Sequence, residues 1–348
     1  MVNAPVSVLI PTYKRAHLLN YVFDALAKQT YKDFEVEVIL KPSGDGTESV
    51  IQRYKNVLKI RLIVQTEGYL TDALNLGLEN SNGKIILLLD DDAIPVPSWV
   101  QSHVDVYKIP NVGGVSGNVL SAKLTGGKVV PMKEPVSQII SNQKTFLKSF
   151  ALKIWSCPIE GLEEYLVYIS KAGVVEYNYD VGCLASHQLA KSLLGMGANM
   201  SFLSEAVLDF KFPKSWILGL GCEQFMGLHI WRKGYNLIFN PNSEVYHLEH
   251  GQTLSRSIRD PKMERLRWIE RGLLFYRLYG TEQNLSRMHR ISWLIFSAAD
   301  DIKKTCWNKE TWRIIRLRAS FNSELIGLKW LLSRKLSGYY SPLTDLKK

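Results

Sequence analysis

Cysteine is scarce in this sequence, and the few cysteines lie far apart. The 348 residues include four cysteines, and no two of them form a Cys-x-x-Cys pair. A zinc cluster needs closely spaced thiols and a disulfide framework needs paired ones, so neither class of protein is indicated. The sequence therefore predicts reduced thiols in a cytosolic compartment.

Long apolar runs and a leader-like start are also missing. Residues 1–7 show no basic start followed by an apolar stretch, so no signal peptide is predicted. The longest apolar runs, such as 291–299, fall well short of the ~20 residues needed to span a bilayer. We therefore expect a cytoplasmic protein that consists of a large domain and an appendage.

Most of the chain carries almost no net charge, and the net positive charge is concentrated at one end. Residues 251–348 carry 20 Lys/Arg and 9 Asp/Glu, a net charge of +11. The remaining residues carry 23 basic and 24 acidic groups, a net charge of −1. This asymmetry predicts a neutral catalytic domain over 1–253 and a basic helical region over 254–348.

What the first part does have is a regular alternation of strand and helix patterns. Apolar and alternating runs predict strands, and apolar residues three or four apart predict helices. The predicted strands are 6–10, 34–40, 60–64 and 85–89, and the predicted helices are 17–29, 47–54 and 70–80. Such an order implies right-handed βαβ units, hence an α/β fold with a mainly parallel sheet and helices on both faces.

Farther along, the pattern is weaker. A further strand is expected over 112–119, short helices over 204–209 and 223–233, and strand ends at 237–239 and 244–247. Segment 121–195 has no clear period and receives no assignment.

The carboxyl ends of the predicted strands carry the candidate binding residues. Segments 11–15, 41–46 and 90–92 each follow a strand directly. Because ligands bind beyond the carboxyl ends of strands in such sheets, these three segments are expected to share one rim.

Three consecutive carboxylates, Asp90-Asp91-Asp92, end the most apolar of these strands. They repel one another, and burial raises the cost of ionising each, so a bound cation would relieve both penalties. Oxygen ligands suit Mg²⁺ or Mn²⁺, which can neutralise a diphosphate leaving group. The alternative is an acidic turn in which Asp92 is the N-cap of a helix after Pro95.

Several motifs, taken in order, resemble family 2 glycosyltransferases of the GT-A fold. The resemblance runs from Val6 to about Thr253 with a gap in the middle. It is carried by Val8-Leu9-Ile10-Pro11-Thr12-Tyr13-Lys14-Arg15, Asp45-Gly46-Thr47, Asp72-Ala73-Leu74-Asn75, Leu89-Asp90-Asp91-Asp92, Gly197-Ala198-Asn199, Gly221-Cys222-Glu223-Gln224 and Val245-Tyr246-His247. The resemblance implies a Rossmann-like GT-A sheet, with a nucleotide-binding half over about 1–119 and an acceptor half over about 120–253.

The resemblance also implies roles for particular residues. Glu223 falls at the place of the family's catalytic base, and inverting transfer needs such a carboxylate to take the acceptor proton. The implied metal ligands, for Mn²⁺ or Mg²⁺, are Asp90, Asp92 and His247. The implied nucleotide-sugar contacts are Pro11, Thr12, Tyr13, Arg15, Lys41, Asp72, Asp90 and Asp91. The implied acceptor-side residues are Gly197, Asn199 and Trp216.

Two departures from the family pattern stand out. Cys222-Glu223 replaces the family's Glu-Asp pair, which gives the base a longer side chain. Lys41-Pro42 stands where an acidic residue usually contacts the nucleotide base, so the identity of the nucleotide is left open.

Each role has a structural alternative. Glu223 suits the dipole at the start of a helix. His247 could be a structural histidine after an edge strand, with His250 taking its place at the metal. Thr12 could cap a helix and leave Arg15 exposed, and Arg232 and Lys233 could be a solvated helix end.

The basic region carries two helical patterns, over 263–279 and 311–336, with apolar stripes among arginines and tryptophans. Basic amphipathic helices with tryptophan are typical of proteins that bind anionic membrane surfaces. The alternative, which is the commoner case, is that the apolar stripes pack on the catalytic domain and leave the basic residues in solvent. No nucleic-acid-binding motif is visible, so no nucleic acid is expected as a partner.

The sequence thus predicts an inverting, metal-dependent glycosyltransferase that uses a nucleotide-diphosphate sugar and a glycan or lipid-linked acceptor. An anionic membrane, with the enzyme peripheral on its cytoplasmic face, is a further expected partner. One alternative is a sugar nucleotidyltransferase, but this sequence has no Gly-rich phosphate loop of the kind that such chemistry needs. The other alternative is a non-catalytic membrane or nucleic-acid binding protein.

Overall fold

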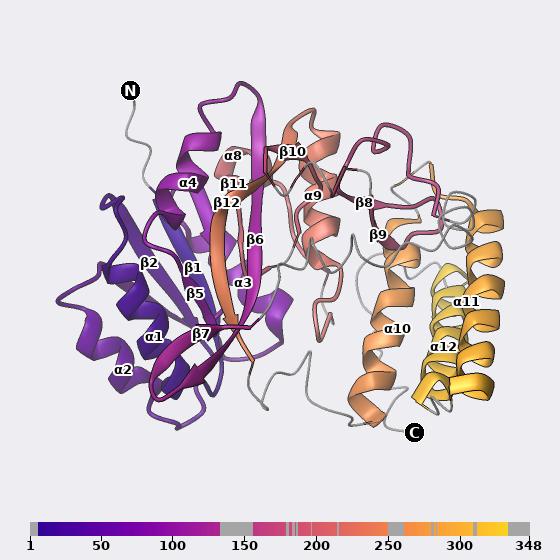
Figure 1. Cartoon of the computed structure of the whole chain (residues 1–348), viewed down its shortest axis with the longest axis horizontal. Helices are drawn as coiled ribbons and strands as arrows, with labels where there is room; N and C mark the ends of the chain where they lie inside the picture. Colours follow the sequence, from indigo (N-terminus) through magenta and orange to yellow (C-terminus); the bar gives the residue numbers. More distant parts are fainter. Residues whose placement is uncertain are drawn as a thin grey trace.

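A computed structural model shows an α/β sheet joined to a group of C-terminal helices (Figure 1). The structure describes residues 6–132, 156–178, 181–182, 185, 187–195, 197–213, 216–249, 261–279, 282, 284–308 and 312–332. The predicted domain boundary at 253 and the alternative ligand His250 lie outside these residues, so the division into 1–253 and 254–348 stays a prediction.

The first half of the sheet has the predicted βαβ order. Its strands are β1 (Val6–Thr12), β2 (Phe34–Leu40), β3 (Ile60–Val64) and β4 (Ile85–Leu88), and its helices are α1 (Ala16–Ala27), α2 (Thr47–Tyr54) and α3 (Leu70–Asn80). The strands pair in parallel in the order β4-β1-β2-β3. Prediction and structure agree on the bounds of β2, β3, α2 and α3.

The second half of the sheet mixes directions. It contains β5 (Ala93–Pro95), β6 (Val112–Thr125), β7 (Lys128–Pro131), β10 (Ala190–Lys191), β11 (Met200–Leu203) and β12 (Asn236–Leu248). The full path is β10-β12-β6-β11-β4-β1-β2-β3, with β5 on β12 and β7 on β6. Along that path four of the seven pairings are parallel. The other three are antiparallel, because β11 and β10 run against their neighbours. A mainly parallel sheet is therefore confirmed.

Several helices complete this part of the fold. They are α4 (Trp99–Val106), α8 (Ser204–Val207) and α9 (Cys222–Arg232), and a separate two-stranded sheet joins β8 (Val167–Ile169) and β9 (Val175–Tyr177). Two apolar clusters cover the sheet. One contains Phe23 and Trp99, and the other contains Phe202 and Trp216.

Some local predictions are wrong. The helix after Pro95 begins at Trp99 with Ser98 as N-cap, so Asp92 does not cap it. Thr12 ends β1 and does not cap α1, which starts at Ala16. The two expected strand ends at 237–239 and 244–247 form one strand, β12, whose register shifts between Asn240 and Glu244.

The C-terminal helices are α10 (Pro261–Leu278), α11 (Arg287–Asn308) and α12 (Trp312–Leu332). Helix α10 packs its predicted stripe inward, with Ile269 and Leu273 fully buried. The Glu270 carboxylate accepts hydrogen bonds from the backbone N–H groups of Ile217 and Leu218 in the segment before α9. This helix is therefore joined directly to the segment before α9. In Figure 1, α11 and α12 lie side by side at the end of the molecule farthest from α1 and α2.

Candidate active site

The acidic triplet lies where β4 ends, and β12 brings a histidine to it. The β5–β12 pairing sets His247 opposite Ala93, and the Leu248 N–H donates to the Asp92 carbonyl oxygen at 2.9 Å. His247 Nε2 is 3.2 Å from Asp92 Oδ1 and 3.7 Å from Asp90 Oδ2. Because β12 pairs with β5 and β6, His247 lies inside a strand with neighbours on both sides and does not follow an edge strand. The choice between a structural histidine and a metal ligand stays a prediction.

These three side chains fit a hard divalent cation. One ligand atom from each of Asp90, Asp92 and His247 can be chosen so that all lie within 4.8 Å of one another. Two carboxylate oxygens and one imidazole nitrogen are a donor set that Mn²⁺ or Mg²⁺ accepts. The Asp92 side chain is 7% exposed and that of Asp90 is 36% exposed, so the Asp90 side is open to a substrate phosphate.

Asp91 turns away from this cluster toward the turn after β1. Its Oδ1 is 3.8 Å from Arg15 Nε. Burial, with the charge of Asp92, raises the pKa of Asp91 to about 8, and Arg15 acts in the opposite direction. Asp91 therefore links the turn after β4, which carries the candidate metal ligands, to the predicted nucleotide-binding turn after β1.

Glu223 lies in the first turn of α9, after Gly221, which adopts the left-handed conformation that glycine favours. Its Oε1 accepts a hydrogen bond from the Gly197 N–H at 3.1 Å. Burial raises the pKa of Glu223 to about 7, and the charge of Asp90 acts in the same direction. A carboxylate with a pKa near neutral is suited to general-base chemistry.

A cleft of about 940 Å³ opens beside the turn after β1. Its walls include Tyr13 and Arg15 from this turn and Asp45 from the loop after β2. Burial would raise the pKa of Asp45, but hydrogen bonds from Thr47, Ala16 and Ser43 outweigh it and lower the pKa to about 2. Asp45 thus ties the starts of α1 and α2 together as a charged wall of the cleft.

Lys41 lies between two tyrosine rings next to this cleft. Its Nζ is 5.7 Å from the centroid of Tyr13 and 5.5 Å from that of Tyr69, and it donates to the Gly68 carbonyl at 2.5 Å. Both rings are partly exposed. The Asp72 carboxylate accepts from the Tyr69 N–H at 2.8 Å, so Asp72 holds Tyr69 in place. Pro11 and Thr12 are the last residues of β1, below the turn.

The acceptor-side residues divide into two kinds. Gly197 contacts Glu223 directly, whereas Asn199 and Trp216 are fully buried. Asn199 Oδ1 accepts from Trp99 Nε1 at 2.8 Å, and Asn199 Nδ2 donates to the Ser243 carbonyl at 2.7 Å. Trp216 stacks under the Arg277 guanidinium at 4.2 Å. These two side chains position the strands and the segment before α9, and the acceptor roles given to them stay predictions.

Two positioning residues were not predicted. Tyr69 closes the far side of Lys41, and Glu270 on α10 holds the segment before α9. Tyr69 was detectable as an aromatic residue at the start of a predicted helix on the same rim. No local signal identifies Glu270, because its partners are backbone N–H groups about fifty residues earlier. Arg232 and Lys233, predicted as a solvated helix end, form ion pairs with Glu282 and Asp209.

Comparison with solved structures identifies the fold of this chain. In comparisons with solved structures, the chain is similar to a mannosyltransferase from Pyrobaculum calidifontis determined in complex with GDP-Man and Mn²⁺. The TM-score is 0.54 with 16% sequence identity, covering 93% of this chain and 86% of the other. A sheet of this arrangement is the GT-A fold of glycosyltransferases.

The sequence comparisons show a similarity to one family of glycosyltransferases. Residues 7–158 match the family described as glycosyl transferase family 2. The chain is 26% identical over 257 residues to chondroitin synthase from Escherichia coli, covering 70% of this chain and 34% of that protein. It is 30% identical over 147 residues to glycosyltransferase AglE from Haloferax volcanii, covering 38% of this chain and 48% of that protein.

The chain thus spans about a third to a half of the length of these two curated relatives. The part of the chain that matches glycosyl transferase family 2 is residues 7–158, and the predicted resemblance to that family is confirmed.

Proposed function

We propose that this chain transfers a sugar, with inversion at the anomeric carbon, from a nucleoside-diphosphate sugar to a hydroxyl group of a glycan or lipid-linked acceptor. The observation that carries the proposal is the grouping of Asp90, Asp92 and His247 within 4.8 Å at the end of β4. Glu223 is close enough to this group for the charge of Asp90 to raise its pKa. The family match and the names of the relatives support sugar transfer as the reaction.

In this proposal Asp90, Asp92 and His247 hold Mn²⁺ or Mg²⁺, which would neutralise charge on the diphosphate leaving group. The acceptor hydroxyl oxygen forms a bond to the anomeric carbon from the face opposite the diphosphate. As the bond from that carbon to the diphosphate oxygen breaks, Glu223 takes the hydroxyl proton. The products are an inverted glycoside and a nucleoside diphosphate, so atoms and charges balance.

The donor would lie across the rim formed by the turn after β1 and the end of β4. Tyr13 offers an exposed ring for stacking on the base, and Arg15 offers a planar fork for phosphate. The GDP-Man and Mn²⁺ in the Pyrobaculum enzyme support a nucleotide sugar and a cation as ligands of this chain. Lys41 supplies a cation where the family usually has a carboxylate, so the base is left open.

A thermal-shift panel tests this proposal. Ligands that bind only the native state raise its stability, by ~2.7 kcal/mol at a hundred times the dissociation constant. We expect the melting temperature to rise with a nucleoside diphosphate plus Mn²⁺ and to change little with either alone. A shift that appears only with a nucleoside triphosphate would favour a nucleotidyltransferase. If no nucleotide shifts the melting temperature with either cation, the proposal is overturned and a non-catalytic binding protein is favoured.

Location belongs to the same proposal. A cytoplasmic enzyme with a lipid-linked acceptor would work at an anionic membrane surface. Among the helices that the structure describes, none combines the length and the apolar character needed to cross a membrane.

A further inference from the structure

Helix α11 turns its apolar side chains outward. Met288, Ile291, Ile295 and Ile302 recur at helical spacing, and all four are exposed, Ile295 to 67%. Residues three, four and seven apart lie on one face of a helix. Normally such a face packs into the core, so here the usual direction of burial is reversed.

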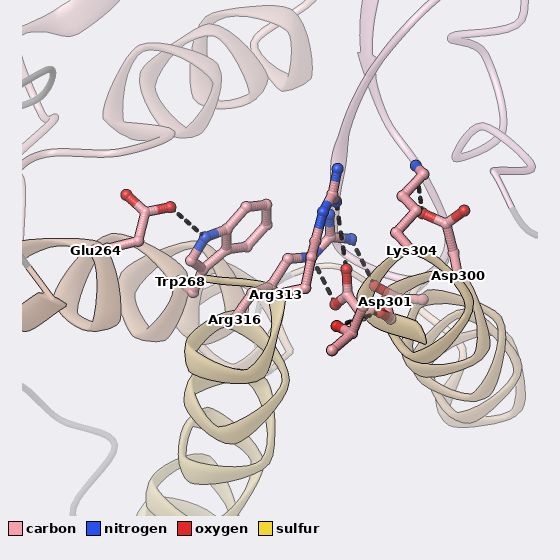
Figure 2. A network of polar contacts seen from close by, with 9 residues as sticks. Glu264, Trp268, Asp300, Asp301, Lys304, Arg313 and Arg316 are labelled. Atoms are coloured by element: carbon pink, nitrogen blue, oxygen red, sulfur yellow. Dashed lines mark hydrogen bonds and ion pairs between the residues drawn. The ribbon is translucent and has the colours of Figure 1, made fainter. Parts of the chain in front are cut away.

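The polar side of the same helix faces inward. Asp301 is buried and forms ion pairs with Arg313 at 3.3 Å and with Arg316 at 3.0 Å (Figure 2). The Arg316 guanidinium also stacks on the Trp268 ring of α10 at 4.3 Å. Because these polar partners hold α11 against α10 and α12, the helix cannot turn its apolar face inward without losing them.

Helix α12 repeats the arrangement. Its exposed apolar side chains are Ile314, Phe321, Leu325, Leu328 and Leu332, at spacings of three, four or seven, and Phe321 is 62% exposed. On the other side, Ala319, Ser323 and Trp330 are buried. The Glu324 carboxylate accepts hydrogen bonds from Tyr276 and Arg290. Both outer helices therefore expose their apolar stripes.

The two stripes meet. Ile302 of α11 and Ile314 and Leu317 of α12 line one shallow cavity of about 100 Å³ between the helices. We call the combined surface, made of the exposed apolar side chains of α11 and α12, the outer face. Soluble proteins seldom expose a contiguous apolar patch without a partner to cover it.

The charges around the outer face identify the kind of partner. Among the side chains of α11 and α12 that the structure describes, every exposed charged residue is basic, namely Arg287, Lys303, Arg318 and Lys329. The acidic residues Asp300, Asp301 and Glu324 are each engaged in an ion pair. An apolar strip with a basic border complements an anionic surface with an apolar interior.

We propose that the outer face docks on an anionic lipid bilayer, with α11 and α12 lying in the plane of the interface. Amphipathic helices with a basic border bind membranes in this manner. A second copy of the chain fits less well, because pairing two outer faces would bring the basic borders of both copies together. Where the proposed function holds, the bilayer would present the lipid-linked acceptor, but docking itself does not depend on catalysis.

The test is co-sedimentation of the full chain with vesicles of phosphatidylcholine, with and without phosphatidylglycerol, and without donor or acceptor. We expect binding only to the anionic vesicles, weaker at high salt but still present. The combined change Ile295→Ser, Phe321→Ser and Leu325→Ser should weaken binding about tenfold or more, because three apolar groups no longer leave water. Changing Arg318→Gln and Lys329→Gln together should weaken it about 25-fold, since each basic residue near an anionic surface contributes about fivefold.

A matched control uses an exposed apolar residue elsewhere. Leu208→Ser alters a side chain that is as exposed as those of the outer face but lies after α8, and it should leave vesicle binding unchanged. The melting temperature of the triple variant should equal that of the wild type, because its three side chains already face solvent.

Three results would overturn the proposal. The full chain could fail to bind anionic vesicles at low salt, or the triple variant could melt far below the wild type, which would make the stripe part of the core. The third is a dimer, seen by sedimentation velocity, that dissociates in the triple variant while vesicles are not bound. Because a nucleotide-dependent thermal shift is measured separately, failure of docking is distinguishable from failure of the proposed function.

Discussion

At the scale of single residues, the site separates three adjacent carboxylates into two tasks. Asp90 and Asp92 turn toward His247, and Asp91 turns toward Arg15. The triplet lies in the turn between β4 and β5, where the Ala93 N–H donates to the Asp90 carbonyl oxygen at 3.2 Å. Glu223 is partly buried, and burial, with a smaller effect from the charge of Asp90, raises its pKa to about 7.

The first prediction concerns Glu223→Gln. Loss of a general base should lower the transfer rate ~100-fold or more. Binding of the donor should not change, because Gln keeps the shape and can still accept the Gly197 N–H. Steady-state release of nucleoside diphosphate measures the rate, and calorimetry measures donor binding. Glu205→Gln makes the same change in the first turn of α8 and serves as the control. Near-normal turnover in Glu223→Gln would assign the proton to another group.

A second prediction concerns pH. Burial, together with the charge of Asp90, raises the pKa of Glu223 to about 7, and only the deprotonated form can act as a base. The rate should therefore rise as the pH increases through that region and level off above it. A cation held by Asp90 acts in the opposite direction and would shift the midpoint to lower pH. The Glu223→Gln variant should lack this limb, and its presence there would assign the limb to a different group.

At the scale of elements, helix α10 decides how the segment before α9 is held. Glu270 is fully buried, and its carboxylate accepts the N–H groups of Ile217 and Leu218. Burial raises the pKa of Glu270, while Arg277 acts to lower it. Arg277 of α10 also stacks on the Trp216 ring. Helix α10 therefore holds the segment before α9 through the backbone N–H groups of that segment and through the Trp216 side chain.

A third prediction follows for Glu270→Ala. The change leaves the N–H groups of Ile217 and Leu218 without their carboxylate acceptor, and each buried polar group that loses its partner costs about 1–3 kcal/mol. We expect a clearly lower free energy of unfolding in urea. Glu264→Ala on the same helix, where the carboxylate pairs with Arg267 nearer the surface, should cost far less. Equal losses in the two variants would mean that the Glu270 contacts do not stabilise the fold.

Some helices and strands could be predicted from the sequence alone, and others could not. The bounds of α2, α3, β2 and β3 are predictable because each has a clean period bounded by turn residues. Strand β12 is not, since Pro241-Asn242 interrupts its apolar pattern where the register shifts. The candidate metal ligands Asp90, Asp92 and His247 could be listed from motifs. The hydrogen bond from the Gly197 N–H to Glu223 joins residues 26 apart and has no local sequence signal.

The outward direction of α11 and α12 illustrates the same limit. Periodicity identifies an apolar stripe but does not say whether the stripe or the opposite face is buried. The partners of Asp301 and Glu324 decide that question, and they come from other helices.

At the scale of the whole molecule, the candidate metal site is assembled from distant parts of the chain. Asp90 and Asp92 lie between β4 and β5, and His247 comes from β12, more than 150 residues later in the sequence, through the β5–β12 pairing. Asn199 and Trp99 hold the strands that bring them together. The cation site therefore depends on the folding of the whole sheet, and it is the feature on which the proposed reaction rests.

Calorimetric titration of a nucleoside diphosphate into the protein with Mn²⁺ tests that feature most directly, using wild type, Asp92→Ala and the control Asp209→Ala. Asp209 is a surface carboxylate paired with Lys233, outside the site. We predict cation-dependent binding in wild type and in the control, and its loss in Asp92→Ala with the circular dichroism spectrum unchanged. Cation-dependent binding of equal affinity in Asp92→Ala would contradict the assignment of the metal site.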